Sequence, residues 1–310
     1  MNQDNIYQEP MHPWPSLGPF GKKISLSSLD IELFYFEAGQ ENPEIIILIH
    51  GLGDEADTWR HIFLPLAQNF HVIALDLPGF GRSQKENLAF TPESLVESLF
   101  GLIHNLNIAH PILMGSSLGA MLAHRIAHAN PTLLRALILV GGALNQNDMG
   151  ANLSMRLMQI PLLGEWLYTR LRKDPDAAFK SLNSVYHDLM NLPPEDRNFL
   201  FTRVNKRVWD DGQKDAYLSL LRKLPGWVRG QQEQIAKRSA TLDIPTLVVR
   251  GEFDSLFSEN CGLTLVREQP NAQMVEIEGA GHLPHQEKPA EFLQRVEKWL
   301  AQEILASQKS

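Results

Sequence analysis

The chain has 310 residues, 44% of them hydrophobic and 21% charged, which suits one large domain, or a domain with an insertion, around a full apolar core. Its formal net charge of -8 argues against a nucleic acid as partner. The single cysteine, Cys261, excludes an internal disulfide and any metal site built from several cysteines.

Residues 1–20 are polar and rich in proline, and they lack the basic start and the apolar segment of a signal peptide. No apolar run approaches the roughly 20 residues that a membrane span needs. We therefore expect a cytoplasmic protein without a transmembrane segment, whose residues 1–20 form a loosely held arm. No feature of the sequence predicts an oligomeric state.

The first part of the chain alternates between predicted strands and helices. Residues 23–29 and 31–36 alternate apolar and polar side chains, which predicts an antiparallel hairpin. Residues 44–49 are a glutamate followed by four isoleucines and a leucine without alternation, a pattern typical of a central parallel strand covered on both faces. Further buried strands are predicted at residues 71–75, 112–114 and 134–140, and helices at residues 59–67, at residues 91–106 and after residue 118.

From residue 144 to residue 240 this alternation stops and only helical periodicity is visible. The segment holds 15 Lys and Arg against 11 Asp and Glu, whereas the rest of the chain holds 13 against 25. A mildly basic helical insert in an acidic body is therefore predicted. Its boundaries divide the chain into a first core segment (1–143), a helical cap (144–240) and a second core segment (241–310).

After the insert, strands are predicted at residues 244–249 and 274–277, with a helix at residues 261–268 between them and an amphipathic helix at residues 289–305 after them. Together with the first part, this predicts eight strands. Strands alternating with helices indicate an α/β protein with a mostly parallel sheet and helices on both faces.

The nucleophile candidate is Ser117, in the turn between the predicted strand 112–114 and the helix after it. A serine exposed between a strand end and a helix start requires strained backbone, and side chains two residues away on either side would collide. Gly115 and Gly119 lack those side chains. Ser116 does not have the same symmetric glycine neighbours, so we interpret it as a neighbour of the nucleophile.

A serine nucleophile needs a base within hydrogen-bonding distance, and the base needs a group that orients it. Reactive groups of open parallel sheets gather at the carboxyl ends of the strands. Those ends supply Asp254 after strand 244–249 and His282 after strand 274–277. The predicted triad therefore has the chain order Ser117, Asp254, His282.

Several other residues compete for these roles. His285 is an alternative base, but it lies beyond Pro284 and nearer to the last helix. Asp148 and Glu252 are alternative acids, although Glu252 points the other way in the two-residue alternation of its strand. His124 and His128, one turn apart on the helix after Ser117, are interpreted as ordinary helix residues because no third metal ligand is apparent.

An oxyanion hole needs backbone N–H groups aimed at the position where negative charge develops. Leu118 N–H follows the nucleophile at a helix N-terminus, and Leu52 N–H lies in the glycine-flanked loop after strand 44–49. We predict that these two groups form the hole. Trp59 could line the substrate pocket, although an aromatic residue at helical spacing can equally belong to the core.

Five motifs at strand ends together resemble the α/β-hydrolase superfamily, and within it the group with a helical cap inserted after the sixth strand. They are HGLG at residues 50–53, DLPGFGRS at 76–83, GSSLG at 115–119, GEFD at 251–254 and GH at 281–282. The resemblance implies an α/β-hydrolase fold, a Ser117–Asp254–His282 triad and an oxyanion hole at Leu52 and Leu118. Ser117 at the apex disfavours the haloalkane dehalogenases and epoxide hydrolases, which use aspartate. Ser116 departs from relatives that often carry histidine, asparagine or tryptophan there.

These features predict a serine hydrolase of the carboxylesterase or lipase type, acting on a small-molecule ester without metal or organic cofactor. Apolar residues of the insert suggest an apolar acyl or alkyl group, although they could instead form the insert's own core; they are Leu153, Met155, Leu157, Met158, Ile160, Leu162, Leu163, Trp166 and Leu167. The same triad also serves C–C bond hydrolases, lactonases, amidases, thioesterases and cofactor-free haloperoxidases or perhydrolases. A receptor with a hydrolase fold and slow turnover is the alternative outside enzymes.

Overall fold

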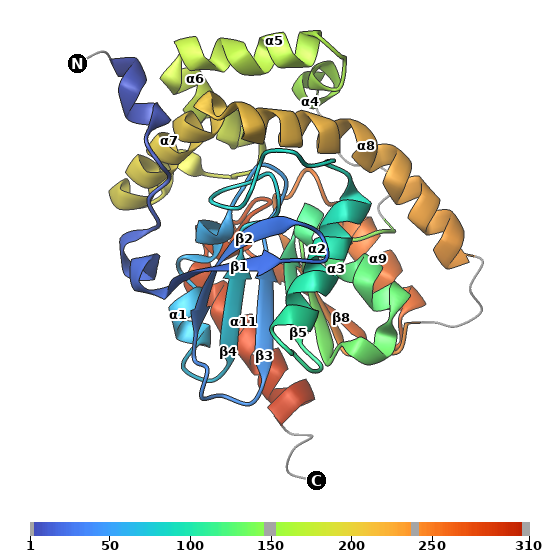
Figure 1. Cartoon of the computed structure of the whole chain (residues 1–310). Helices are drawn as coiled ribbons and strands as arrows, with labels where there is room; N and C mark the ends of the chain where they lie inside the picture. Colours follow the sequence, from blue (N-terminus) through green and yellow to red (C-terminus); the bar gives the residue numbers. More distant parts are fainter. Residues whose placement is uncertain (1–2, 146–152, 237–241, 306–310) are drawn as a thin grey trace.

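The computed structural model describes residues 3–145, 153–236 and 242–305 (Figure 1). Its centre is a single sheet of eight strands, as predicted. The strands are β1 (Gly21–Leu26), β2 (Ile31–Ala38), β3 (Ile45–Ile49), β4 (His71–Leu75), β5 (Ile112–Ser116), β6 (Ala136–Val140), β7 (Thr246–Gly251) and β8 (Ala272–Ile277).

The strand order is β1-β2-β4-β3-β5-β6-β7-β8. β1 and β2 form the expected antiparallel hairpin, with Leu26 opposite Ile31, and β2 also runs antiparallel to β4. All other neighbouring strands are parallel. The chain passes from β3 to β4 on one side and later to β5 on the other side, so the order reverses at β3. In open α/β sheets a ligand site forms beside the carboxyl ends of the strands at such a reversal.

The sheet is covered by helices on both faces. The helices of the core segments are α1 (Phe63–Leu66), α2 (Pro92–Asn105), α3 (Leu118–Ala129), α9 (Glu259–Glu268), α10 (Pro284–Glu287) and α11 (Pro289–Leu300), joined by the short helices η3 (Ala56–Trp59), η4 (Pro131–Leu133) and η8 (Ala301–Leu305). Figure 1 shows α2 and α3 in front of the sheet and α11 behind it.

Alternate residues of the central strands belong to two separate apolar cores. In β3, Ile47 and Ile49 pack with residues of α2 and α3, whereas Ile46 and Leu48 pack with residues of α1 and α11. All four side chains are fully buried. This two-sided burial explains why the strand has no apolar–polar alternation.

The predicted helix at residues 59–67 is instead the short helix η3, a turn and the four-residue helix α1. The backbone N–H of Ala56 donates a hydrogen bond to Asp76 Oδ1 at 2.7 Å. The backbone N–H of Trp14 donates to Asp57 Oδ1 at 2.5 Å. These tertiary contacts hold η3, which leads into the predicted segment and ends at its first residue, Trp59.

Between β6 and β7 the described residues, 153–236, form helices and no strand. We call this segment the helical insert. Its helices are α4 (Leu153–Met158), α5 (Leu163–Arg170), α6 (Pro175–Lys180), α7 (Pro194–Trp209) and α8 (Asp211–Ala236), with the short helices η5 (Leu171–Lys173), η6 (Ser181–Ser184) and η7 (Leu189–Asn191). In Figure 1, α8 crosses above the sheet, and α4 and α5 lie above α8, farthest from the strands.

The N-terminal arm is docked, which corrects the expectation that it is loosely held. It contains the short helices η1 (Gln3–Gln8) and η2 (Pro15–Phe20) and runs along α7. Lys206 Nζ donates to the carbonyl oxygen of Pro10 at 2.9 Å, and Arg203 Nη2 donates to that of His12 at 2.7 Å. Backbone carbonyls carry no sequence signature, so the arm's composition could not predict this docking.

None of the helices in the described ranges combines the length and the apolar character needed to cross a bilayer.

Candidate active site

Ser117 lies at the junction of β5, which ends at Ser116, and α3, which begins at Leu118. Its backbone has φ 52° and ψ -113°, a left-handed conformation that is rare for a residue with a side chain. Strained backbone of this kind clusters at functional sites, where the surrounding structure holds it in place. The observed turn is the one that the glycine spacing predicts.

The two flanking glycines allow the start of α3 to lie directly against the sheet. A methyl group on Gly119 would be 2.2 Å from the carbonyl oxygen of Ile49, and one on Gly115 would be 2.3 Å from the backbone of Gly119. Both distances are far inside van der Waals contact. Any side chain at either position would therefore push α3 away from β3 and β5 and displace Ser117.

His282 is bound to Asp254. The Nδ1 atom of His282 is 2.9 Å from both carboxylate oxygens of Asp254. Asp254 is itself held by the backbone N–H groups of Leu256 and Phe257, which donate to Oδ1 at 2.8 and 2.9 Å. Because a carboxylate only accepts hydrogen bonds, Nδ1 donates to Asp254, and Nε2 is the nitrogen that points away from it.

One cavity of about 250 Å³ brings together four of the predicted site residues: Ser117, His282, Leu52 and Leu118. The turn after β6 lies between the first two. A methyl group on Gly141 would lie 3.1 Å from the His282 ring, and one on Gly142 would lie 2.6 Å from the carbonyl oxygen of Ser117. Among the described residues, His282 Nε2 has no hydrogen-bond partner. The cavity lies at the strand-order reversal, where β3 and β5 end.

The alternative base and acids have different surroundings. His285 is fully buried, with Nε2 3.0 Å from Thr58 Oγ1, and burial lowers its pKa to about 3. It is absent from the cavity wall. Glu252 accepts a hydrogen bond from the backbone N–H of Gly279 at 2.9 Å, which holds the loop before His282. Asp148 lies outside the described residues.

Trp59 is a core residue, which corrects its prediction as a pocket residue. It is fully buried, and its ring centroid lies 4.3 Å from that of His285. It belongs to the apolar core that includes α1 and α11 and does not line the cavity. The break between η3 and α1 turns this ring toward the core, and helical spacing alone could not show that direction.

His50 fixes the loop that contains Leu52. It is fully buried, and burial lowers its pKa, so the ring is neutral. The backbone N–H of Leu77 donates to Nε2 at 2.9 Å, and Nδ1 is 2.7 Å from the carbonyl oxygen of Gly51. Since Nε2 accepts, Nδ1 must donate. The His-Gly pair of the motif therefore joins the loop after β3 to the loop after β4.

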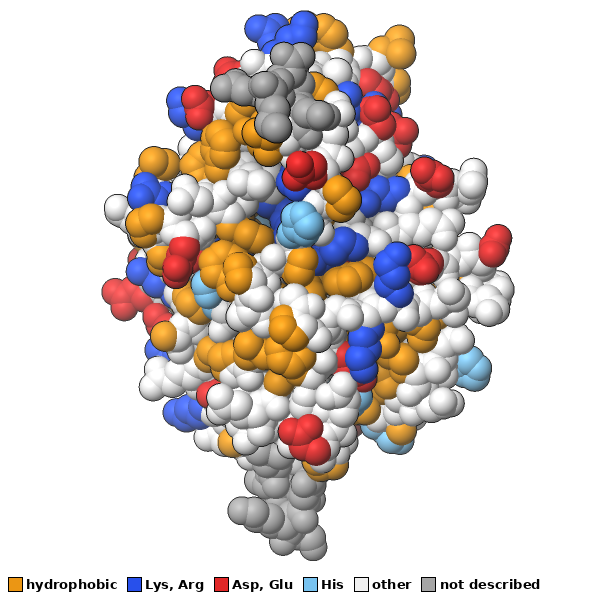
Figure 2. Space-filling view, turned by 60° about the vertical axis from the view of Figure 1, so that its left-hand side comes forward, with side chains coloured by type: hydrophobic (Ala, Val, Ile, Leu, Met, Phe, Trp, Pro, Cys, Tyr) orange, Lys and Arg blue, Asp and Glu red, His pale blue; other side chains and the backbone are white. Residues whose placement is uncertain are grey.

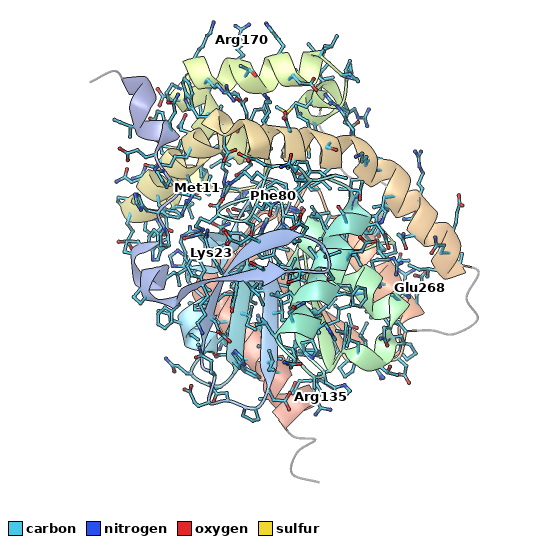
Figure 3. All side chains as sticks on the ribbon, viewed as in Figure 1. Met11, Lys23, Phe80, Arg135, Arg170 and Glu268 are labelled. Atoms are coloured by element: carbon cyan, nitrogen blue, oxygen red, sulfur yellow. The ribbon has the colours of Figure 1, made fainter. Side chains whose placement is uncertain are left out.

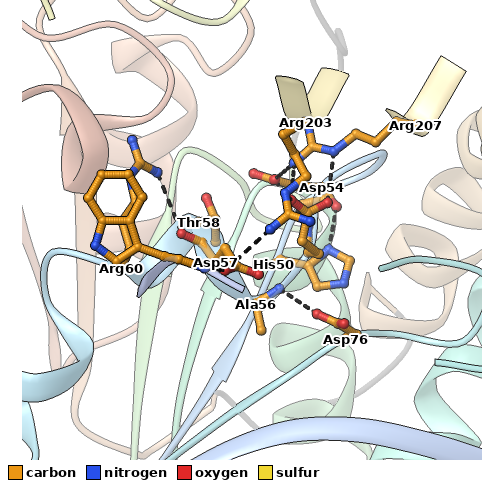
Figure 4. Close-up of polar contacts among 12 residues, drawn as sticks. His50, Asp54, Ala56, Asp57, Thr58, Arg60, Asp76, Arg203 and Arg207 are labelled. Atoms are coloured by element: carbon orange, nitrogen blue, oxygen red, sulfur yellow. Dashed lines mark hydrogen bonds and ion pairs between the residues drawn. The ribbon is translucent and has the colours of Figure 1, made fainter. Parts of the chain in front are cut away.

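A buried network of carboxylates and guanidinium groups surrounds this loop (Figure 4). Asp76, at the end of β4, accepts three hydrogen bonds from Arg82: from the backbone N–H at 2.7 Å, Nε at 2.8 Å and Nη2 at 3.0 Å. The DLPGFGRS motif thus forms one closed turn around a buried carboxylate. Its role is structural, because Asp76 and Arg82 are not part of the cavity wall.

The network also attaches the helical insert to the loop after β3. Arg207, on α7, donates through Nε and Nη2 to the two carboxylate oxygens of Glu55, both at 2.7 Å, and it also contacts Asp54. Burial opposes the charge of Arg207, but Glu55 and Asp54 outweigh this effect and raise its pKa. Arg203, one turn earlier, contacts Glu55 at 2.9 Å. Figure 4 shows both arginines above Asp54.

Arg207 was not predicted from the sequence, and neither was most of the cavity wall that the insert supplies. The apolar residues of that wall include Tyr168, Leu171, Leu182, Leu200, Val204, Tyr217 and Leu221. Of the nine apolar residues proposed for the pocket, only Met155 and Met158 line it. The spacing of Arg203 and Arg207 places them on one face of a helix, but it does not show what that face contacts.

Comparison with known proteins agrees with this fold. Residues 44–289 match the model of the alpha/beta hydrolase fold family. The chain belongs to the α/β-hydrolase family. An uncharacterized protein of Mycobacterium tuberculosis is 30% identical over 267 residues, which cover 82% of this chain and 74% of that protein.

Two further proteins show the range of the family. A 2-hydroxy-6-oxononadienedioate/2-hydroxy-6-oxononatrienedioate hydrolase of Pseudomonas putida is 28% identical, over 84% of this chain and 88% of that protein. A thermophilic esterase of Thermogutta terrifontis has the same fold, with a TM-score of 0.72 and 23% identity, over 91% of this chain and 98% of that chain. The α/β-hydrolase fold predicted from the five motifs is therefore confirmed.

We expect Arg207→Met to lower the free energy of unfolding by about 3 kcal/mol, because it leaves the buried carboxylate of Glu55 with less compensation. Arg222→Met is the matched control: its partner Glu165 is 39% exposed, and loss of such a pair costs less than about 1 kcal/mol. Urea unfolding followed by circular dichroism measures both values. Equal destabilisation by the two variants would contradict a dominant role for the buried pair.

His285 predicts a pH-dependent stability. Its folded pKa of about 3 lies below the unfolded value of 6.5, so the unfolded state takes up the proton first as pH falls. Stability should therefore decrease below about pH 6.5, and His285 should account for about 2 kcal/mol between pH 8 and pH 5. The unfolding free energy of His285→Gln should vary less with pH over this range. If the two proteins had parallel curves, His285 would not be the cause.

Proposed function

We propose that this α/β-hydrolase is a serine hydrolase that cleaves a carboxylic ester through an acyl-enzyme intermediate. Ser117 is the nucleophile, His282 the general base and acid, and Asp254 the group that holds the imidazole. Leu52 and Leu118 supply the backbone N–H groups of the oxyanion hole. The reaction needs no metal or organic cofactor.

In the first step, Ser117 Oγ attacks the ester carbonyl carbon while His282 Nε2 takes the hydroxyl proton. Asp254 accepts the Nδ1–H bond throughout and stabilises the imidazolium that forms. The carbonyl oxygen becomes an oxyanion, and the N–H groups of Leu52 and Leu118 donate to it. Leu118 begins α3, so the partial positive charge of the helix N-terminus adds to this stabilisation.

In the second half of the reaction, the intermediate collapses and His282 returns the proton to the leaving alkoxide, which departs as an alcohol. Water then enters, His282 Nε2 takes one of its protons, and the resulting hydroxide attacks the acyl carbon. Collapse of the second tetrahedral intermediate releases the acid and returns the proton to Ser117. The two half-reactions use the same base and the same oxyanion hole.

The observation that carries this proposal is the pairing of two features in one cavity. Ser117 is held in left-handed backbone at a strand–helix junction. His282 binds Asp254 through Nδ1 and leaves Nε2 without a partner among the described residues. A nucleophile and an oriented base in one cavity are what acyl transfer needs, and the hydrogen bond between Ser117 Oγ and His282 Nε2, which is not formed in this structure, would form when substrate is bound.

The cavity supports an apolar acyl or alkyl group as part of the substrate. The helical insert, which we propose acts as a cap spanning residues 144–240, covers it mainly with leucine, methionine, valine and tyrosine. Burial raises the pKa of Tyr217 to about 12, so its hydroxyl stays neutral at physiological pH. Asp54 and Arg207 also line the cavity, and their charges are bound: Arg207 contacts both Asp54 and Glu55.

Hydrolysis of a C–C bond next to a ketone is the second candidate. It is supported by the Pseudomonas putida relative, whose name gives that class of substrate. The same Ser–His–Asp arrangement also serves lactonase and cofactor-free haloperoxidase or perhydrolase chemistry, and a slow-turnover receptor would keep it as well. Reactivity of Ser117 without turnover of simple esters would favour these alternatives over the ester hydrolase.

Ser117→Ala should lose labelling by a fluorophosphonate and should lower kcat for p-nitrophenyl esters by about 10⁴-fold or more, because the nucleophile is gone. Ser116→Ala is the matched control: it changes the adjacent serine, which is fully buried, and should keep both activities within about tenfold of wild type. Mass spectrometry of the labelled protein and initial-rate assays provide the readouts. Labelling that survives in Ser117→Ala would overturn the assignment.

We expect kcat/KM for p-nitrophenyl esters to rise with acyl length until the cavity is filled, because each buried methylene contributes about 0.8 kcal/mol. Leu171 lines the cavity, so Leu171→Trp should occupy part of the cavity volume and move the best substrate toward shorter acyl chains. Leu263→Trp, on α9 and outside the cavity, should leave the profile unchanged. Equal turnover of short polar and longer apolar esters by the wild type would disprove an apolar acyl site.

A further inference from the structure

Helices α4 and α5 have two opposite faces, and only the inner one is explained by the cavity. Met155 and Met158 of α4, the buried Tyr168 of α5 and Leu171 directly after α5 line the cavity. Four other apolar residues of this segment are exposed and belong to no core. Leu162 is 84% exposed, Leu153 73%, Trp166 55% and Ile160 48%. We call these four residues the outer apolar face.

The outer apolar face is organised by helix geometry. Trp166 and Arg170 lie four residues apart on α5, so they share one side of the helix. Leu162 is the residue directly before α5, and its carbonyl oxygen accepts a hydrogen bond from the backbone N–H of Trp166 at 3.1 Å. In Figure 3, α5 is the outermost element of the insert and Arg170 points away from the protein. The guanidinium of Arg170 lies 5.3 Å from the Trp166 ring, so a cation and an aromatic ring share this exposed side.

Leu162 adds a further observation. Its backbone has φ 68°, a left-handed conformation that is unfavourable for a leucine. The side chain placed by this backbone is the most exposed of the large apolar side chains described. Strain in the backbone and exposure of the side chain are both unfavourable for the free protein. A partner that buries Leu162 would compensate for at least the exposure.

The exposed charged residues within residues 153–173 are basic. Arg156, Arg170 and Lys173 are exposed and lie in the same stretch of chain as the four apolar residues, and the exposed acids Asp174 and Asp176 follow directly after it. Residues 153–173 contain one acid, Glu165, and Arg222 binds it at 2.7 Å. Figure 2 shows basic and hydrophobic side chains, with acidic ones beside them, at the end of the molecule that carries the insert. We call Arg156, Arg170 and Lys173 the basic rim.

We propose that the outer apolar face and the basic rim dock onto an anionic lipid surface. Apolar side chains that enter the acyl region, with Lys and Arg beside anionic head groups, are the two contributions by which helices bind at a lipid–water interface. Tryptophan and arginine suit this position because each combines an apolar body with a polar end. The acidic body is repelled by the same surface, which turns the insert toward the lipid.

Charge distinguishes this partner from a second copy of the chain. A two-fold symmetric dimer through this face would place the basic rim of one copy against the basic rim of the other. Such like-charge contacts are unfavourable, whereas an anionic lipid surface complements all three cations at once. The observed charges therefore favour lipid over self-association.

Docking in this orientation would place a lipid phase directly outside the cavity, because α4 and α5, which carry the outer apolar face, also form part of the cavity wall. Lipid binding is nevertheless independent of the proposed reaction. Ser117→Ala should bind vesicles as the wild type does, so loss of the catalytic proposal would leave this one intact. Use of Ser117→Ala also prevents any hydrolysis from altering the vesicles during the measurement.

The test is co-sedimentation of the full-length chain with vesicles of phosphatidylcholine alone and of phosphatidylcholine with about one third phosphatidylglycerol. We expect strong binding only to the anionic vesicles, and weaker binding as salt is raised. Leu162→Asp combined with Trp166→Ser should lower the partition coefficient at least about tenfold. Arg170→Glu combined with Lys173→Glu should lower it by about fivefold or more for each charge.

The matched controls are Leu263→Asp and Arg267→Glu. They make the same kinds of change at exposed positions of α9, which lies outside the helical insert. They should bind as the wild type does. Absence of binding to anionic vesicles, equal binding to both vesicle types, or unchanged binding by the outer-face variants would each overturn the proposal. A dimer in light scattering that the Leu162 and Trp166 changes dissociate would assign the face to self-association instead.

Discussion

The close approach of α3 to the sheet is the constraint on which the site depends. Gly119 lies so near the carbonyl oxygen of Ile49 that no side chain fits between them. This contact fixes the first turn of α3 over the ends of β3 and β5, and Ser117 must take a left-handed backbone to join the strand to the helix. The position of Ser117 and the direction of the Leu118 N–H group therefore follow from backbone packing, which a flexible loop could not provide.

A second constraint joins the loop after β3 to its neighbours. His50 binds the start of the loop after β4, and Glu55 and Asp54 bind Arg207 of the insert. Leu52 lies between these two attachments. The position of the insert and the position of an oxyanion-hole candidate are thus set by one network of buried charges. Because a buried charge that loses its partner is costly, this arrangement holds the insert at one place above the sheet.

The helical insert has a different relation to solvent on each side. Its inner residues form the apolar cavity wall, while Leu162 and Trp166 on the outer side of α5 remain exposed beside basic residues. Both faces come from one short stretch of helix, so a contact on the outside lies a single helix diameter from the cavity. This short distance connects the proposed acyl site with the proposed lipid-docking face, although each stands on separate observations.

The sequence by itself determined the eight strands, the division into body and helical segment, and the order of Ser117, Asp254 and His282. These features are local: strand periodicity, glycine spacing and residues at strand ends are all written within a few positions. Only the tertiary structure decided that Trp59 belongs to the core, that the N-terminal arm docks on α7, and that most apolar residues proposed for the pocket lie elsewhere. It also decided the pairing of Glu55 with Arg207, 152 positions apart. Periodicity shows that a helix has faces, but which partner meets each face depends on contacts between distant segments, and these exist only once the chain has folded.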